Sequence, residues 1–266
     1  MGKVISIINQ KGGSGKTTTA TNMAVCLADM GYKVLLIDLD GQCNSSFNLG
    51  CIDYKNRTNS IIGLLSAILY KNEIPKDYII HTEYNVDLIP SNSNEFKQLS
   101  DSATVKAGGY FLLRKLIKQE KLSEKYDYII IDNNGYLGSM VQNSILASTD
   151  LLIPASASSF DFQGIFELIN FVTDIINDDN LNMNEINLNG VLITDDESRT
   201  QVSKEIKEQF NSTFENIYFY QNTIPHSQDI RKSQFKGKVL CGMRDKSAAK
   251  DAYYNFVKEW IEHENN

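Results

Sequence analysis

The sequence lacks the features that mark membrane-spanning, metal-binding or disulfide-bonded proteins. Its four cysteines, Cys26, Cys43, Cys51 and Cys241, contain no C-x-x-C pair, so we expect neither a zinc cluster nor a disulfide framework. No apolar run reaches the roughly 18 to 20 residues that cross a bilayer, and no repeat or low-complexity linker interrupts the chain. We therefore expect a cytoplasmic protein with free thiols and no membrane contact.

The sequence also lacks a net positive charge. It has 26 Lys and Arg against 33 Asp and Glu, for a formal charge of -7, so any contact with nucleic acid must use a local patch. Between residues 199 and 250, ten basic residues stand against five acidic ones. This segment favours sequence-independent contact with DNA phosphates, although lysines and arginines that only keep a surface soluble would give the same count.

Short apolar runs alternate with segments of helical length along the whole chain. The runs are residues 4–8, 34–37, 86–89, 128–131, 151–153, 188–193 and 217–224. Runs such as Ile129-Ile130-Ile131 are apolar on successive residues, which is typical of parallel strands covered by helices on both faces. The pattern predicts a doubly wound α/β fold with a mostly parallel sheet, in one domain spanning residues 1–266.

A glycine-rich segment lies between the first apolar run and the first expected helix, which we place from near Lys16 to Gly31. Its residues from Gly12 to Thr17 read G-G-S-G-K-T. Glycines let backbone N–H groups turn inward around phosphate oxygens, and the helix N-terminus favours negative charge. Lys16 would neutralise the β- and γ-phosphates, while the Thr17 hydroxyl would contact Mg²⁺. The segment predicts a binding site for a nucleoside triphosphate.

Eight consecutive residues carry a resemblance to a known family. Lys11-Gly12-Gly13-Ser14-Gly15-Lys16-Thr17-Thr18 resembles the deviant Walker A motif of the ParA/MinD family of P-loop ATPases. The resemblance implies that these residues bind ATP with Mg²⁺, and that the chain forms a homodimer around the nucleotide. It also implies that Lys11 reaches the partner subunit's phosphates, where a second cation would offset developing charge.

Two acidic segments extend the resemblance. Asp38-Leu39-Asp40-Gly41-Gln42 is similar to the family's D-x-D-x-Q segment, which implies that Asp40 orients the attacking water and that Asp38 supports Mg²⁺. Asp132, at the end of a further apolar run, resembles the Walker B acid that holds the metal's water shell. The family commonly continues with two prolines, but this chain has Asn133-Asn134-Gly135. We expect a more flexible and polar loop there, which would affect hydrolysis more than binding.

The resemblance is looser toward the C-terminus. Gly190–Thr194 followed by Arg199-Thr200 resembles a strand and R-T segment in which the arginine is implicated in non-specific DNA binding. We assign Arg231, Lys232 and Lys236 of the basic segment to the same surface. Pro225 and His226 stand where the family often has I-P-R beside the adenine, so both are expected at the base, with histidine in place of arginine.

These features together predict a partitioning ATPase. The resemblance implies a ParB-like, centromere-binding partner that stimulates slow hydrolysis, and the protein is expected in the cytoplasm on the nucleoid. One alternative is a MinD-like ATPase that acts on a membrane or a protein cargo, but the C-terminal segment 253–266 is amphipathic and acidic rather than basic. A metabolic or iron–sulfur ATPase of the same fold is a third possibility, although the cysteines form no evident cluster.

Overall fold

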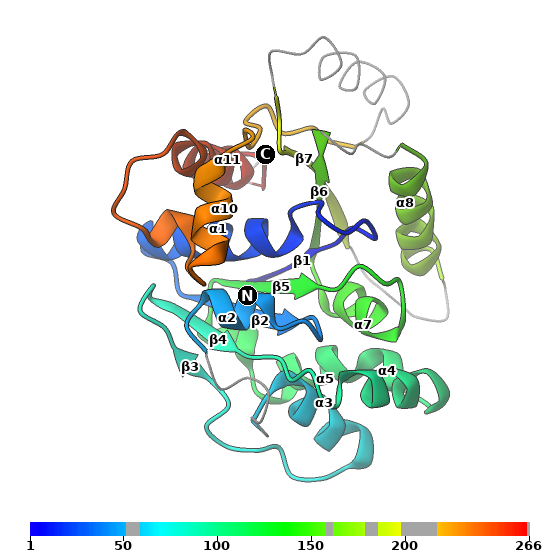
Figure 1. Ribbon diagram of the computed structural model, residues 1–266. Coiled ribbons are helices and arrows are strands. Elements are labelled where there is room, and N and C mark those ends of the chain that lie inside the picture. Colours follow the sequence, from blue (N-terminus) through cyan, green and yellow to red (C-terminus); the bar gives the residue numbers. More distant parts are fainter. Residues whose placement is uncertain (52–58, 158–161, 179–185, 198–216, 265–266) are drawn as a thin grey trace.

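The computed structural model describes residues 1–51, 59–157, 162–178, 186–197 and 217–264, which form a central sheet with helices on both faces (Figure 1). The strands are β1 (Lys3–Ile7), β2 (Val34–Leu39), β3 (Ile80–His81), β4 (Val86–Ile89), β5 (Tyr128–Asn133), β6 (Asp150–Ser156) and β7 (Asn187–Thr194). Their order in the sheet is β3-β4-β2-β5-β1-β6-β7, and β3 pairs antiparallel to β4 while the other pairs are parallel. This order confirms the doubly wound fold predicted from the sequence.

The helices connect these strands in turn. They are α1 (Lys16–Asp29), α2 (Asn44–Asn48), α3 (Ile61–Tyr70), α4 (Phe96–Val105), α5 (Leu112–Gln119), α6 (Leu122–Lys125), α7 (Ser139–Ala147), α8 (Phe162–Ile176), α10 (Gln228–Phe235) and α11 (Ala248–Glu264), with short 3-10 turns at Gly109–Phe111 and Leu240–Gly242. Among the described residues, none of these helices is long and apolar enough to cross a membrane.

Successive residues of the central strands face opposite helix layers. Tyr128 and Ile130 of β5 pack in one cluster with α1 and α11, whereas Ile129 and Ile131 pack in another with α3 and α5. A third cluster joins α7 and α8 to β6 and β7. Because both faces of the central strands β2 and β5 are buried, their apolar runs are continuous rather than alternating.

Helix α11 packs on the sheet as an ordinary core helix. Its Tyr253, Phe256, Val257 and Trp260 are buried, and Trp260 meets the Tyr128 ring edge-on with the ring centroids 5.5 Å apart. Its apolar face is therefore occupied by the protein's own core.

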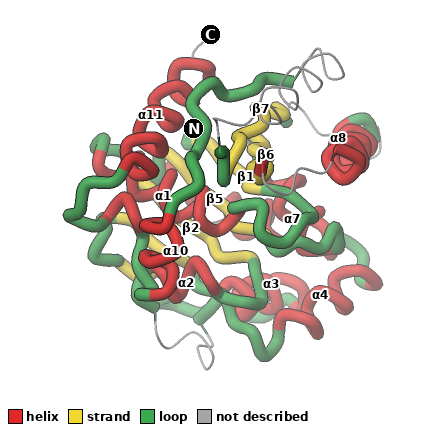
Figure 2. Tube along the Cα trace, turned by 45° about the horizontal axis from the view of Figure 1, so that its top comes forward, coloured by secondary structure: helices red, strands yellow, loops and turns green. Residues whose placement is uncertain are grey.

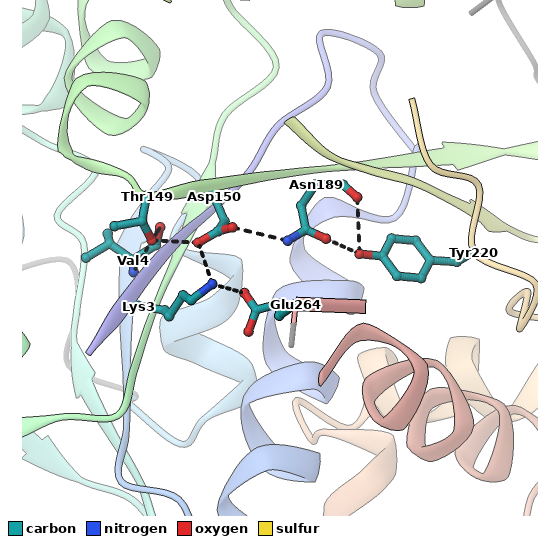
Figure 3. Close-up of polar contacts among 7 residues, drawn as sticks. All are labelled: Lys3, Val4, Thr149, Asp150, Asn189, Tyr220 and Glu264. Atoms are coloured by element: carbon teal, nitrogen blue, oxygen red, sulfur yellow. Dashed lines mark hydrogen bonds and ion pairs between the residues drawn. The ribbon is translucent and has the colours of Figure 1, made fainter. Parts of the chain in front are cut away.

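A buried polar network fastens the end of α11 to the sheet (Figure 3). Lys3 Nζ lies 3.0 Å from Glu264 Oε1 and 3.7 Å from Asp150 Oδ2. Asn189 Nδ2 donates to Asp150 Oδ1 at 3.1 Å, and the Tyr220 hydroxyl donates to Asn189 Oδ1. Burial raises the pKa of Glu264 to about 7, although its bond from Lys3 opposes this shift. The network joins β1, β6, β7 and the C-terminal helix.

One predicted strand is wrong. Residues 217–224 form no regular strand beside β7. Phe219 makes an isolated bridge to Val191, and Ile224 N donates to Ile193 O at 2.9 Å. The pairing is interrupted between these points because the amides of Gln221 and Asn222 donate to the Glu259 carboxylate, at 2.7 and 2.8 Å, and not to the backbone of β7. A side chain from α11 thus takes the hydrogen bonds that a strand would have used.

Candidate functional site

The glycine-rich segment leaves β1 and enters α1 at the carboxyl edge of the sheet, as the sequence predicted. Gly13 and Gly15 have φ values of 77° and 90°, a left-handed conformation that side chains other than glycine rarely adopt. Asn9 fixes the start of this loop, because its Nδ2 donates to Pro154 O at 2.8 Å while its Oδ1 accepts from Lys11 N at 2.9 Å. Thr194 Oγ1 donates to Ser14 O at 3.0 Å and fixes the other side.

Lys16 is folded into this loop. Its ammonium group donates to Lys11 O at 3.1 Å, so it lies in the concave space that the backbone surrounds. Burial lowers the pKa of Lys16, and this effect is opposed by the charges of Asp132 and Asp40. A buried cation among inward-turned N–H groups is a site that favours an anion with several negative charges.

Two buried carboxylates lie side by side below the loop. Asp38 of β2 and Asp132 of β5 are partners in the strand register, and both are fully buried. Asp38 Oδ2 accepts from Ser46 N at 2.7 Å and from Ser46 Oγ at 2.6 Å. Asp132 Oδ2 accepts from Ser45 Oγ at 2.6 Å, and its other oxygen has no hydrogen-bond partner.

Burial raises the pKa of both carboxyl groups, and the charge of Asp132 adds to the shift of Asp38. The nearby Thr17 hydroxyl lowers the pKa of Asp132 and opposes this shift. The charge of Asp132 thus affects the pKa of Asp38, and the Thr17 hydroxyl affects the pKa of Asp132. An added cation would stabilise both carboxylates in their charged forms.

Asp40 is more exposed than these acids and lies at the rim of the site. Its Oδ1 accepts from Gln42 N at 2.9 Å, while its own N–H donates to Asp38 Oδ1 at 3.2 Å. This turn holds the Asp40 carboxylate at the carboxyl edge of the sheet, close enough to Lys16 for their charges to interact.

Asn133 is not part of a flexible loop, contrary to the expectation from the sequence. It is the last residue of β5 and is 1% exposed. Its Nδ2 donates to Ser6 Oγ at 2.8 Å and Ile7 O at 3.1 Å, and Ser6 Oγ lies 2.5 Å from Ser144 Oγ. Asn133 thus links β5, β1 and α7 directly beneath the phosphate loop.

The following glycine brings the chain back over that loop. A Cβ atom at Gly135 would lie 2.9 Å from Gln10 O and 3.7 Å from Lys16 Nζ, so only glycine permits this approach. Gln10 in turn donates to Gly164 O of α8 at 2.9 Å. The segment after Asp132 is therefore packed against the phosphate loop.

A cavity of about 190 Å³ lies beside the phosphate loop on the side of α10. It is lined by Gly13, Gly15, Thr18, Thr194, Asp195, Ile224, Ser227, Ile230, Arg231, Gln234 and Tyr253. Gly13 and Gly15 of the loop form part of the cavity wall. A ligand whose phosphates lie in the loop could therefore place its remaining part in this cavity.

Pro225 and His226 border this region without lining the cavity; their neighbours Ile224 and Ser227 line it. His226 Nδ1 lies 2.6 Å from Asp195 Oδ1, and His226 N donates to Asp196 O at 3.1 Å. The histidine therefore orients Asp195, which does line the cavity.

The residues assigned to DNA lie in different places. Arg231 lines the cavity, while Lys232 and Lys236 are exposed on α10 and just after it. Lys232 Nζ is 3.7 Å from Asp229 Oδ1, a surface pair of little energetic weight. Arg199 lies outside the described residues.

Several contacts at the site were not predicted from the sequence. Ser45 and Ser46 hold the two buried acids, and their only sequence signal is a serine pair shortly after Asp40. Thr194 ends β7 beside the loop, and Gln234 Nε2 donates to Thr18 Oγ1 at 2.7 Å. These contacts join residues far apart in the sequence, so spacing alone does not reveal them.

Comparison with known proteins gives a consistent result. A family model described as an AAA domain matches residues 2–186. The sporulation initiation inhibitor protein Soj of Bacillus subtilis is 30% identical over 269 aligned positions, which cover 97% of this chain and 98% of that protein.

Solved structures with the same fold include nucleotide complexes. A plasmid partition protein from Borrelia burgdorferi bound to AMPPNP is 25% identical with a TM-score of 0.75, covering 98% of this chain and 99% of that one. Cobyrinic acid a,c-diamide synthase from Mycobacterium smegmatis, with an ATP analogue and magnesium, has a TM-score of 0.82 at 24% identity and covers 100% of this chain and 97% of the other. The latter likeness shows the fold alone.

Proposed function

Since this chain belongs to the ParA/MinD family of P-loop ATPases, we propose that it is a partitioning ATPase that dimerises on ATP and binds DNA without sequence preference. The observation that carries the proposal is a phosphate loop with two lysines, Lys11 and Lys16, above a buried acid pair at the carboxyl edge of one sheet. The similarity to Soj and to a plasmid partition protein supports the cellular role.

The residues at the loop fit ATP and Mg²⁺. The backbone from Gly12 to Thr18 would hold the phosphates, and Lys16 would exchange its bond with Lys11 O for phosphate oxygens. The unpartnered oxygen of Asp132 is buried and close to Thr17, so it is suited to a cation's water shell. Mg²⁺ would supply charge neutralisation at the phosphates, with Thr17 as a direct oxygen ligand and Asp38 and Asp132 behind it.

Hydrolysis would depend on this chain's own rim residues. Asp40 would orient the attacking water, and Lys11 of each subunit would reach the phosphates bound by its partner. Phosphoryl transfer is accelerated mainly by the positions and charges of such groups, so small displacements of Asp40 or Lys11 would change the hydrolysis rate. A slow basal rate, accelerated by a ParB-like partner, would follow if the partner completes this alignment.

Binding to non-specific duplex DNA tests the proposal. Affinity is measured with ATP, with ADP and without nucleotide, at low and high salt, together with the molecular mass in each state. Binding that requires ATP, accompanies a dimer and weakens with salt is expected, because phosphate contacts release counterions. An ATP dimer that is indifferent to DNA would contradict partitioning and favour a membrane or protein cargo.

A further inference from the structure

Helix α10 presents two chemically different faces. Ser227, Ile230, Arg231 and Gln234, spaced by three, one and three residues from its N-cap onward, line the cavity beside the phosphate loop. This spacing is one face of a helix. Lys232 and Lys236 are exposed, and so is Phe235 at 92%. One short helix therefore forms a wall of the nucleotide cavity and also carries exposed cations around an exposed aromatic ring.

Both ends of α10 are attached at the cavity. At its start, Ser227 Oγ caps the helix by accepting from Asp229 N at 3.1 Å, directly after His226, which lies 2.6 Å from Asp195 Oδ1. At its end, Gln234 Nε2 donates to Thr18 Oγ1 at 2.7 Å. Figures 1 and 2 show α10 lying beside α1, the helix that begins at the phosphate loop.

The Gln234–Thr18 bond is the direct link between the two helices. Thr18 lies in the first turn of α1, two residues after Lys16, and lines the cavity together with Gly13 and Gly15, so it is close to any phosphate bound in the loop. The bond joins exposed side chains, and water competes for both partners. Its strength therefore depends on whether a ligand in the cavity excludes water and holds both helices in place.

We infer that Gln234 is a positioning residue that transmits nucleotide occupancy to the exposed surface formed by Lys232, Phe235 and Lys236. Nucleotide in the cavity stabilises the existing contact between α10 and α1 through Gln234 and Thr18, and this holds the surface in the orientation that contacts DNA phosphates. The inference rests on the proposed function for its DNA partner. The coupling itself is a property of α10 and is measurable without DNA.

Hydrogen exchange of the α10 amides measures the coupling. Wild type, Gln234→Leu and the control Gln228→Leu are compared without nucleotide, with ADP and with ATP. Gln228 is an exposed glutamine of the same helix and does not line the cavity. ATP is expected to slow exchange in wild type and in the control by at least about fivefold, the lower end of usual coupling between sites. In Gln234→Leu the slowing is expected to disappear even at ATP concentrations that saturate this variant, as set by its own ATP titration.

Thr18 variants show whether the bond itself is responsible. Thr18→Ser keeps the hydroxyl and should retain the ATP effect, whereas Thr18→Val should lose it. Adding Gln234→Leu to Thr18→Val should cause no further loss, since the two changes remove one interaction. A purely structural bond would instead raise exchange equally in every nucleotide state.

DNA affinity is measured on the same proteins. The ratio of affinities with ATP and with ADP should fall at least about fivefold in Gln234→Leu and remain unchanged in Gln228→Leu. The inference would be overturned if Gln234→Leu showed the same ATP-dependent exchange or the same affinity ratio as wild type. It would also be overturned if ATP had no effect on exchange in wild-type α10. If exchange responds through Gln234 but wild type binds no DNA in any state, the coupling stands and the DNA function fails.

Discussion

At the scale of single residues, we expect Lys16 to determine whether the loop can hold a nucleotide. Its ammonium group already lies inside the loop, on Lys11 O at 3.1 Å, and no other described lysine occupies that position. Lys16→Ala should weaken ATP binding by at least about tenfold, since contacts to charged groups contribute about 1.5 to 3 kcal/mol. Titration calorimetry with ATP and Mg²⁺ measures this loss. Lys33→Ala, at an exposed lysine before β2, is the control, and equal affinity in both variants would contradict the assignment.

Asn133 should contribute to stability, because its buried side chain joins β5 to β1. Asn133→Ala removes the donors to Ser6 Oγ and Ile7 O, which should lower the free energy of unfolding by about 1 to 3 kcal/mol. Urea unfolding measures the change. Asn134→Ala, which removes a bond to Tyr136 N in an exposed turn, should cost less than about 0.5 kcal/mol. If both variants lowered the free energy of unfolding by similar amounts, the hydrogen bonds of Asn133 would not be a special source of stability.

The sequence predicted the residues whose chemistry is tied to a local motif. Lys16, Asp38 and Asp132 lie where the strand and loop pattern placed them, because each stands at the carboxyl end of a strand or the start of a helix. It did not predict Ser46 or Gln234. Their partners are set by how helices pack across the sheet, and a single sequence without that packing gives no distance between them.

At the scale of elements, the apolar runs predicted the six parallel strands of the described sheet, and α1 runs from Lys16 to Asp29 with Gly31 just beyond. The run 217–224 was wrongly predicted as a strand because its apolar residues do enter the core, while the Glu259 carboxylate accepts from the amides of Gln221 and Asn222 in its middle. Helix α10 has polar residues on both faces, so its sequence indicates an exposed helix and does not show that one face lines a cavity.

The junction between α11 and the sheet should make stability depend on pH. Burial raises the pKa of Glu264 from 4.5 to about 7, so the folded state favours the protonated acid. Its contribution is fully present below about pH 4.5 and is lost as the pH rises through about 7. Glu264→Gln should remove this part of the pH dependence.

Urea unfolding of wild type and Glu264→Gln across about pH 5 to 8 tests this expectation. The difference in unfolding free energy, wild type minus variant, should fall as the pH rises. Glu262→Gln, in the same last turn of α11, is the control. A difference that stays constant or increases with pH would mean that Glu264 is stabilised as a carboxylate by Lys3 instead.

At the scale of the whole molecule, one sheet places the phosphate loop, the acid pair and the cavity at its carboxyl edge, and α11 packs in the same core cluster as α1. Lys11 lies on the loop next to Lys16, yet its backbone carbonyl, not its side chain, contacts the Lys16 ammonium. A second subunit facing this edge would receive the Lys11 side chain. The proposed function therefore requires two copies for one complete site.

Mixing two defective variants tests this requirement most directly. In a mixed dimer of Lys11→Ala and Asp40→Ala, the site that keeps Asp40 receives Lys11 from the other subunit. ATP hydrolysis by the mixture should therefore exceed the sum of the two separate activities, while Lys11→Ala mixed with the Lys11→Ala/Asp40→Ala double variant should show no gain. A mixture of the first pair that dimerises with ATP but shows no gain in hydrolysis would contradict a lysine exchanged between subunits.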